Sequence, residues 1–214
     1  MLRVNEIFYS LQGESSYAGR PCVFVRLTGC NLRCAYCDTL YAYDEGQYLN
    51  IDEIIERVAS YRCRLIEITG GEPLLQEDTP SLVHRLLDKG FEVLMETNGS
   101  LDISRIDGRC VKIVDIKCPS SGEEKKNDLE NLKRLSAKDE IKFVIGNRKD
   151  YLYAKKIMSR AKSDNPGMKP PLFSPIYGGI DPQVLAEWIL ADHLEVRINM
   201  QLHKIIWGAE VKGV

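Results

Sequence analysis

The stretch CNLRCAYCDT, residues 30–39, places three cysteines within eight positions at the spacing C-x3-C-x2-C. It closely follows the apolar run 22–27, which predicts a strand. Thiols this close together, in a chain whose first residues carry no apolar secretion signal, indicate metal or redox chemistry rather than structural disulfides. We therefore expect a fold in which a strand delivers this loop to a functional edge.

Further apolar runs rich in β-branched residues alternate with helix-like segments. Together with the first run they predict strands over 22–27, 64–69, 91–97, 110–117, 140–146, 172–176 and 194–202. Asn50 and Glu53 form the pattern of a capping box, while Thr79-Pro80 and Asp181-Pro182 each place a capping residue before proline. Gly90 predicts a helix end, and the polar segments 118–128 and 161–171 predict loops.

Strands that alternate with helices predict an α/β fold with a mainly parallel sheet. A closed eight-fold barrel usually takes about 250 residues. A chain of 214 residues with six or seven strands therefore favours an incomplete TIM-like barrel, in a single domain over 1–214. A doubly wound open sheet is the alternative. In both folds the active residues are expected in loops at the C-terminal ends of the strands.

Charge and composition narrow the class of partner. The formal net charge is −2, and no run approaches 18 apolar residues. We therefore expect no nucleic-acid partner and no membrane-spanning segment. Seven cysteines, an odd number, favour a reducing compartment, so the protein is expected to be cytoplasmic.

The three clustered cysteines are compatible with zinc or with an iron–sulfur cluster. Structural zinc needs four ligands, usually presented as two pairs, and Cys63, Cys110 and Cys118 supply no second pair. A four-iron cluster held by three cysteines leaves one iron open for an external ligand. The pattern favours the cluster, with zinc or incidental cysteines as the alternatives.

With Tyr36 directly before the last cysteine, the motif resembles that of the radical S-adenosylmethionine (SAM) superfamily. The resemblance implies that Cys30, Cys34 and Cys37 bind a 4Fe-4S cluster, and that SAM binds the open iron and yields a 5′-deoxyadenosyl radical. The segment ITGGEP, residues 68–73, lies one strand later, where this superfamily contacts the methionine end of SAM. METNGS and DIKCPSSG, residues 95–100 and 115–122, end the next two predicted strands.

The order of the flanking motifs resembles one family within that superfamily. Six motifs follow one another across nearly the whole chain, as in 7-carboxy-7-deazaguanine synthases. They are NEIFYSLQGES, GRPCVFVRLTGCNLRCAYCDT, ITGGEP, ETNGS, DIKCPSS and QLHK. The resemblance implies a ring-contracting lyase that converts 6-carboxy-5,6,7,8-tetrahydropterin to 7-carboxy-7-deazaguanine and ammonia in queuosine or deazapurine biosynthesis. It also implies a homodimer, Mg²⁺ and an external electron donor.

Matched to the family's motifs, specific residues take expected roles. Thr39 is expected to bind Mg²⁺, whose preferred ligands are oxygens. The expected SAM-binding residues are Tyr36, Cys37, Asp38, Gly71, Asp115, Ile116 and Lys117. The expected substrate-binding residues are Leu11, Gln12, Gly13, Arg26 and Thr69. Chemically, Arg26 suits a carboxylate as a bidentate partner, and the Gln12 amide suits the polar edge of the pterin ring.

Some positions depart from the family or lie outside its motifs. Residues 115–117 are DIK where many relatives have SPK, and the chain ends in Val214, so a terminal-proline contact to substrate is not transferred. Gln201 and His203, in QLHK, stand at alternate positions of a strand, which places them on one side as pocket candidates. A protein-acting activase of the same superfamily and a zinc-binding interaction module are the competing functions. The sequence indicates no general acid or base.

Overall fold

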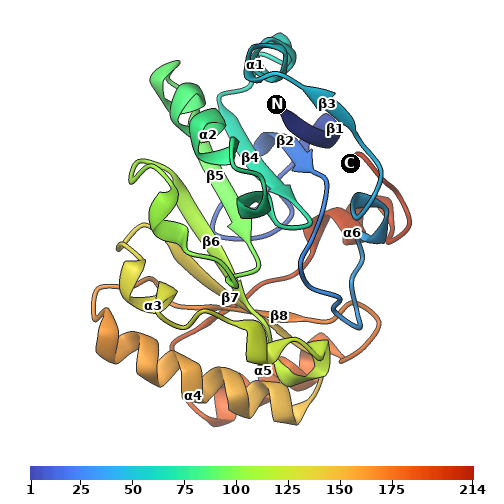
Figure 1. The fold of residues 1–214 in the computed structure, drawn as a ribbon. Helices are drawn as coiled ribbons and strands as arrows, with labels where there is room; N and C mark the ends of the chain where they lie inside the picture. Colours follow the sequence, from blue (N-terminus) through green and yellow to red (C-terminus); the bar gives the residue numbers. More distant parts are fainter.

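Nine strands form one sheet in the computed structural model, which describes residues 1–214 (Figure 1). The strands are β1 (Leu2–Leu11), β2 (Pro21–Leu27), β3 (Gln47–Leu49), β4 (Leu65–Gly70), β5 (Glu92–Thr97), β6 (Val111–Ile116), β7 (Glu140–Ile145), β8 (Leu172–Pro175) and β9 (Arg197–Ile198). The helices are α1 (Ile51–Ser60), α2 (Thr79–Asp88), α3 (Asn131–Arg134), α4 (Arg148–Asp164), α5 (Pro182–Ala191) and α6 (Leu202–Trp207).

The strand order is β3-β1-β2-β4-β5-β6-β7-β8-β9. From β2 onward every neighbouring pair is parallel, and each new strand joins the same edge of the sheet. A doubly wound sheet would instead reverse its order at a switch point. The two end strands, β3 and β9, do not pair with each other, so the sheet forms the curved wall of a barrel that stays open. The incomplete barrel is confirmed, and the doubly wound alternative is wrong.

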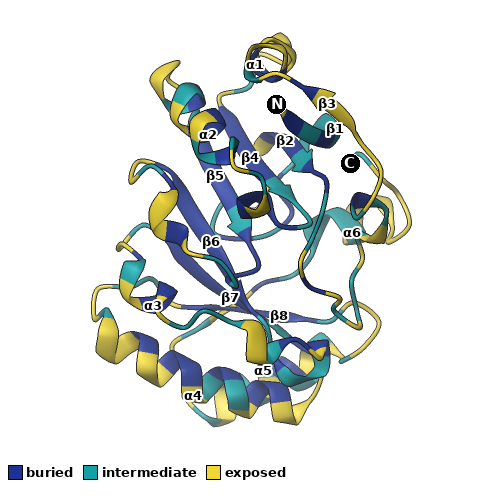
Figure 2. Cartoon of the chain, viewed as in Figure 1, coloured by how far each residue is buried: buried dark blue, intermediate teal, exposed yellow.

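The helices pack on the outer face of this wall. A core of 34 buried residues joins outward-pointing strand residues such as Val23, Ile66 and Met95 to the buried faces of the helices. Figure 2 shows the strands buried and the helices exposed on their outward side. None of the helices combines the length and apolar character that crossing a membrane would need.

The inner face of the wall has two layers, because alternate residues of a strand point to opposite sides. Its lower part, toward the N-terminal ends of the parallel strands, is an apolar plug formed by Cys22, Phe24, Leu65, Leu94, Val111 and Ile113. Above it the inward positions become polar. The transition occurs within β4, from Leu65 through Glu67 to Thr69. The fold therefore places a charged cavity on an apolar floor.

The local helix signals have mixed outcomes. The Asn50–Glu53 capping box and the Asp181 cap are confirmed, and Gly90 follows α2 with a φ of +82°. Thr79 is not the cap of α2, because its hydroxyl donates to the Pro73 carbonyl oxygen at 2.6 Å and the helix already includes it. Residues 161–164 belong to α4 rather than to a loop, whereas 118–128 contains only short 3-10 turns.

Six of the predicted strands are present, and the seventh is largely wrong. Within 194–202 only Arg197–Ile198 pairs, as β9, and the chain then turns into α6. Tertiary contacts decide this turn: the Asn199 amide donates to Ser174 Oγ at 2.8 Å, and Leu202 N donates to Gly13 O at 2.9 Å. Strands β1 and β3 were not predicted.

Candidate active site

A cavity of about 900 Å³ occupies the inner face of the open barrel. It is lined by every residue predicted for the cluster, SAM, magnesium and substrate except one. The exception is Ile116, whose side chain is fully buried in the outer core. Positions separated by more than 100 residues in the sequence therefore share one site.

The loop after β2 carries the three thiols of Cys30, Cys34 and Cys37, which are half-buried, free and exposed to the cavity. Cys30 Sγ accepts from Leu32 N at 3.4 Å and from Asn98 Nδ2 at 3.7 Å. No three cysteine, histidine or acidic side chains converge on a point where one metal ion could bind. Three thiols in one loop without a fourth protein ligand, one of them accepting two N–H groups, fit three corners of an iron–sulfur cube better than one tetrahedral zinc ion.

Gly71 brings the end of β4 against this loop. A Cβ atom there would lie 2.1 Å from Gly29 O and 2.8 Å from Cys30 Cβ, so only glycine fits. The neighbouring Glu72 is buried and accepts from Leu74 N, Asn98 N and the Thr97 hydroxyl. Glu72 thus joins the ends of β4 and β5 and is not available to a ligand.

Two buried polar atoms on the cavity wall have no partner in the protein: Tyr36 Oη and Asp115 Oδ1. The other oxygen of Asp115 accepts from Lys117 Nζ at 2.8 Å. Unpaired buried polar atoms are rare and indicate a polar ligand. Their position beside the thiols fits the polar groups of SAM. Asp115 and Lys117 both line the cavity, although DIK replaces the commoner SPK at residues 115–117.

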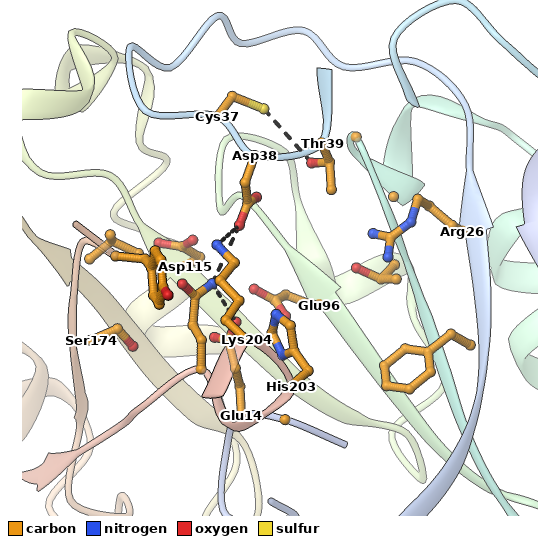
Figure 3. A pocket seen from close by; sticks show the side chains of 18 of the residues that line it. Glu14, Arg26, Cys37, Asp38, Thr39, Glu96, Asp115, Ser174, His203 and Lys204 are labelled. Carbon is orange, nitrogen blue, oxygen red and sulfur yellow. Dashed lines mark hydrogen bonds and ion pairs between the residues drawn. The ribbon is translucent and has the colours of Figure 1, made fainter. Parts of the chain in front are cut away.

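Thr39 and Asp38 extend the site beyond the last thiol (Figure 3). Thr39 Oγ1 lies 3.7 Å from Cys37 Sγ and makes no cap bond to the 3-10 turn Leu40–Ala42, so its hydroxyl remains available to a ligand. Asp38 accepts from Lys204 Nζ at 2.5 Å and from Gln201 Nε2 at 3.4 Å. The C-terminal segment is therefore linked to the cluster loop.

Arg26 points into the cavity from β2 (Figure 3). Its Nε donates to Glu6 Oε1 at 2.8 Å, and its guanidinium lies 5.7 Å and 5.8 Å from the ring centroids of Phe8 and Tyr41. Because its two terminal nitrogens make no hydrogen bond within the protein, they are free to hold a carboxylate in a bidentate pair.

Gln12 also has a structural role in the protein. Its amide nitrogen donates to Glu67 Oε2, and its amide oxygen accepts from Glu14 N at 2.8 Å. Each end of the side chain therefore has one partner in the protein and supports the turn, while Gln12 still lines the cavity with one N–H donor and one acceptor site not used by the protein. Gly13 allows a close approach, because a Cβ there would lie 2.1 Å from His203 Nδ1.

Sequence reasoning missed a charged network at the centre of the cavity. Lys142 Nζ, on β7, binds Glu14 at 2.8 Å, also binds Glu96, and lies 3.9 Å from Asp115. Burial opposes its charge, but these carboxylates outweigh burial and raise the pKa of Lys142 well above its usual value. The only signal was a lysine inside an otherwise apolar strand.

Gln201 and His203 lie at the beginning of α6 and not on a strand, yet both reach the cavity. Gln201 Nε2 donates to Glu14 Oε1 at 3.1 Å. Burial, opposed by Glu14 and assisted by Lys204, lowers the pKa of His203 and favours the neutral ring. The tail also contributes Val214 to the cavity wall.

Comparison with known proteins agrees with this geometry. The sequence profile of the Radical SAM superfamily matches residues 24–116. The 7-carboxy-7-deazaguanine synthase of Koribacter versatilis is 45% identical, with 100% of each chain covered. The protein of the same name from Chlorobaculum tepidum is 46% identical over 100% of this chain and 97% of its own.

Solved structures agree at the level of the fold. The crystal structure of QueE from Escherichia coli superposes with a TM-score of 0.79 at 24% identity, covering 94% of both chains. SuiB of Streptococcus suis bound to SAM matches 80% of this chain and 48% of its own, with a TM-score of 0.57 at 13% identity. With sequence identity extending along its whole length, the chain belongs to the 7-carboxy-7-deazaguanine synthase family of the radical SAM superfamily.

Proposed function

We propose that the protein contracts the ring of 6-carboxy-5,6,7,8-tetrahydropterin to give 7-carboxy-7-deazaguanine and ammonia. The observation that supports this reaction is the meeting of three cluster-binding thiols and a carboxylate-binding arginine, Arg26, in one cavity. The full-length relatives carry the name of this activity. The product would enter queuosine or deazapurine biosynthesis.

The expected cofactors are distributed along the upper rim of the cavity. Cys30, Cys34 and Cys37 would hold the 4Fe-4S cluster, and Thr39 would offer its hydroxyl oxygen to Mg²⁺. The SAM site would comprise Tyr36, Asp38, Gly71, Asp115 and Lys117. When bound, the cluster and SAM supply an organic radical that removes a hydrogen atom from the substrate.

The protein's own groups bind and orient the substrate. Arg26 would hold the carboxylate, Thr69 lies beside it in register on β4, and Leu11 and Gly13 would border the ring. The tail 209–214 lines the cavity and would limit the access of solvent, which protects a radical reaction from side products. His203, which lines the cavity and whose lowered pKa favours the neutral imidazole, would accept or donate a proton during the loss of ammonia.

The assembly is expected to be a cytoplasmic homodimer of single-domain chains, 1–214, that receives electrons from an external donor. All seven cysteines are free, which suits a reducing compartment. These expectations follow the family.

Anaerobic turnover tests the proposal. Reconstituted protein with SAM, reductant, Mg²⁺ and 6-carboxytetrahydropterin should form 7-carboxy-7-deazaguanine, with little 5′-deoxyadenosine, by mass spectrometry. Cys34→Ser should lose iron and product, whereas Cys63→Ser, a half-buried cysteine outside the cavity, should retain both. Deoxyadenosine without deazaguanine would refute the substrate, and about one zinc per chain in place of iron would refute the cluster.

A further inference from the structure

The carboxyl groups of the cavity are unequally paired. Glu14 accepts from Lys142 at 2.8 Å, from Asn199 Nδ2 at 3.3 Å and from Gln201 at 3.1 Å. Glu96 shares the same Lys142, and Asp115 accepts from Lys117 at 2.8 Å. Glu67 makes no ion pair, and its one side-chain hydrogen bond comes from the neutral amide of Gln12.

Glu67 is nevertheless buried and lines the cavity, with 2% of its surface exposed. Gln12 holds Oε2, while Oε1 has no partner in the protein. Burial raises the pKa of Glu67 well above its ordinary value, and Glu96 and Glu14 act in the same direction against Lys142 and Arg26. A buried carboxyl group with one oxygen free in a cavity indicates a ligand that donates hydrogen bonds, and such donors also favour the ionised, accepting form of the group.

The strand register locates Glu67 relative to the carboxylate site. Arg26 pairs with Thr69, and Phe24 pairs with Glu67 two residues earlier on the same strands. Glu67 therefore points to the same side as Thr69 but lies one layer deeper, by about 6–7 Å along β4. A two-ring substrate whose carboxylate is held by Arg26 would extend its opposite edge toward Glu67, over the floor formed by Phe24.

That opposite edge of a pterin carries the N–H donors of an aminopyrimidinone. We propose that Glu67 binds this edge, accepting a hydrogen bond from the 2-amino group, and that Gln12 acts as a positioning residue that orients the Glu67 carboxyl. The assignment rests on the proposed function. It adds, beside Gln12, a ring-edge contact at a residue that was not among the sequence predictions.

Glu67→Gln tests the assignment with little disturbance of the fold. The new amide oxygen keeps an acceptor for Gln12, while its NH₂ group replaces the oxygen that faces the cavity. Two ligands are compared by calorimetry on the reconstituted protein with SAM: 7-carboxy-7-deazaguanine and 7-carboxy-7-deazahypoxanthine, which lacks the 2-amino group. Glu56→Gln, on the exposed face of α1, is the matched control.

We expect the wild-type protein and the control to bind the 2-amino ligand about tenfold tighter or more, and Glu67→Gln to bind both ligands alike. Equal binding by the wild type would overturn the assignment even if the variant did not fold. Unchanged discrimination in Glu67→Gln would also overturn it. If the wild type also forms no deazaguanine on turnover, the proposed function fails and the assignment with it. Normal turnover with unchanged discrimination refutes the role of Glu67 alone.

Discussion

At the scale of single residues, the cavity is held together by one buried cation. Lys142 joins Glu14, which follows β1, to Glu96 at the end of β5. Burial alone would raise the pKa of Glu14, but Lys142 and the hydrogen bonds from Lys142 and Gln201 outweigh it and lower that pKa. The Lys142 ammonium group therefore links the segment after β1 to β5 and also provides positive charge at the centre of the cavity.

Lys142→Met should destabilise the protein by about 2–4 kcal/mol, because it leaves two half-buried carboxylates without their buried cation. Urea unfolding measures the loss. Lys133→Met, which removes an exposed pair with Glu130, is the control and should leave the free energy of unfolding nearly unchanged. A Lys142 variant as stable as this control would show that the network contributes nothing to folding.

At the scale of elements, the site depends on contacts between segments that are not neighbours in the sheet. The loop after β1 meets the beginning of α6, where Leu202 N donates to Gly13 O at 2.9 Å. Nearby, Ser15 N donates to Asn199 Oδ1 at 2.8 Å. These two hydrogen bonds connect the loop after β1 to the segment after β9 on the open side of the barrel. They also place His203 at the cavity.

Gly13→Ala should lower kcat/KM about 10- to 100-fold, because the added methyl group must displace His203 and the first turn of α6. Steady-state kinetics measures the effect, with the iron content as a check that the cluster loop is intact. Gly108→Ala, at a position with no atom within 4 Å of the added Cβ, should behave as the wild type. Equal kcat/KM for both variants would show that the contact between Gly13 and α6 does not contribute to catalysis.

At the scale of the whole molecule, the chain closes an open barrel with its own tail. Residues 209–214 line the cavity although most of them are exposed, and Lys212 Nζ lies 4.2 Å from the centroid of the Tyr41 ring. The segment makes no secondary structure. We therefore expect it to contribute more to covering the site than to the stability of the fold.

Deletion of residues 209–214 should raise KM for the pterin and increase 5′-deoxyadenosine formed per product, because the substrate is held less firmly and hydrogen-atom donors such as the added reductant reach the cavity. The melting temperature should fall by less than about 4 °C, corresponding to at most 1 kcal/mol. Lys212→Ala, which removes only the cation–π contact, should show a smaller change in KM. An unchanged KM and product ratio in the deletion variant would exclude a covering role.

The sequence by itself determined what depends on short-range order. Strand alternation, helix caps such as Asn50, and the C-x3-C-x2-C spacing of Cys30, Cys34 and Cys37 are local patterns, so the open barrel and the cluster loop could be predicted. The resemblance added the residues along the cavity wall, and all of them except Ile116 reach it.

Only the tertiary structure decided which polar groups already have partners. Gln12 is paired with Glu67, Glu72 with the end of β5, and the predicted strand 194–202 turns into α6 against Gly13. A buried lysine or glutamate in a strand looks like a packing residue until its partners are known. Their partners come from distant segments, and the cost of burying a charge depends on those partners and not on the neighbouring sequence.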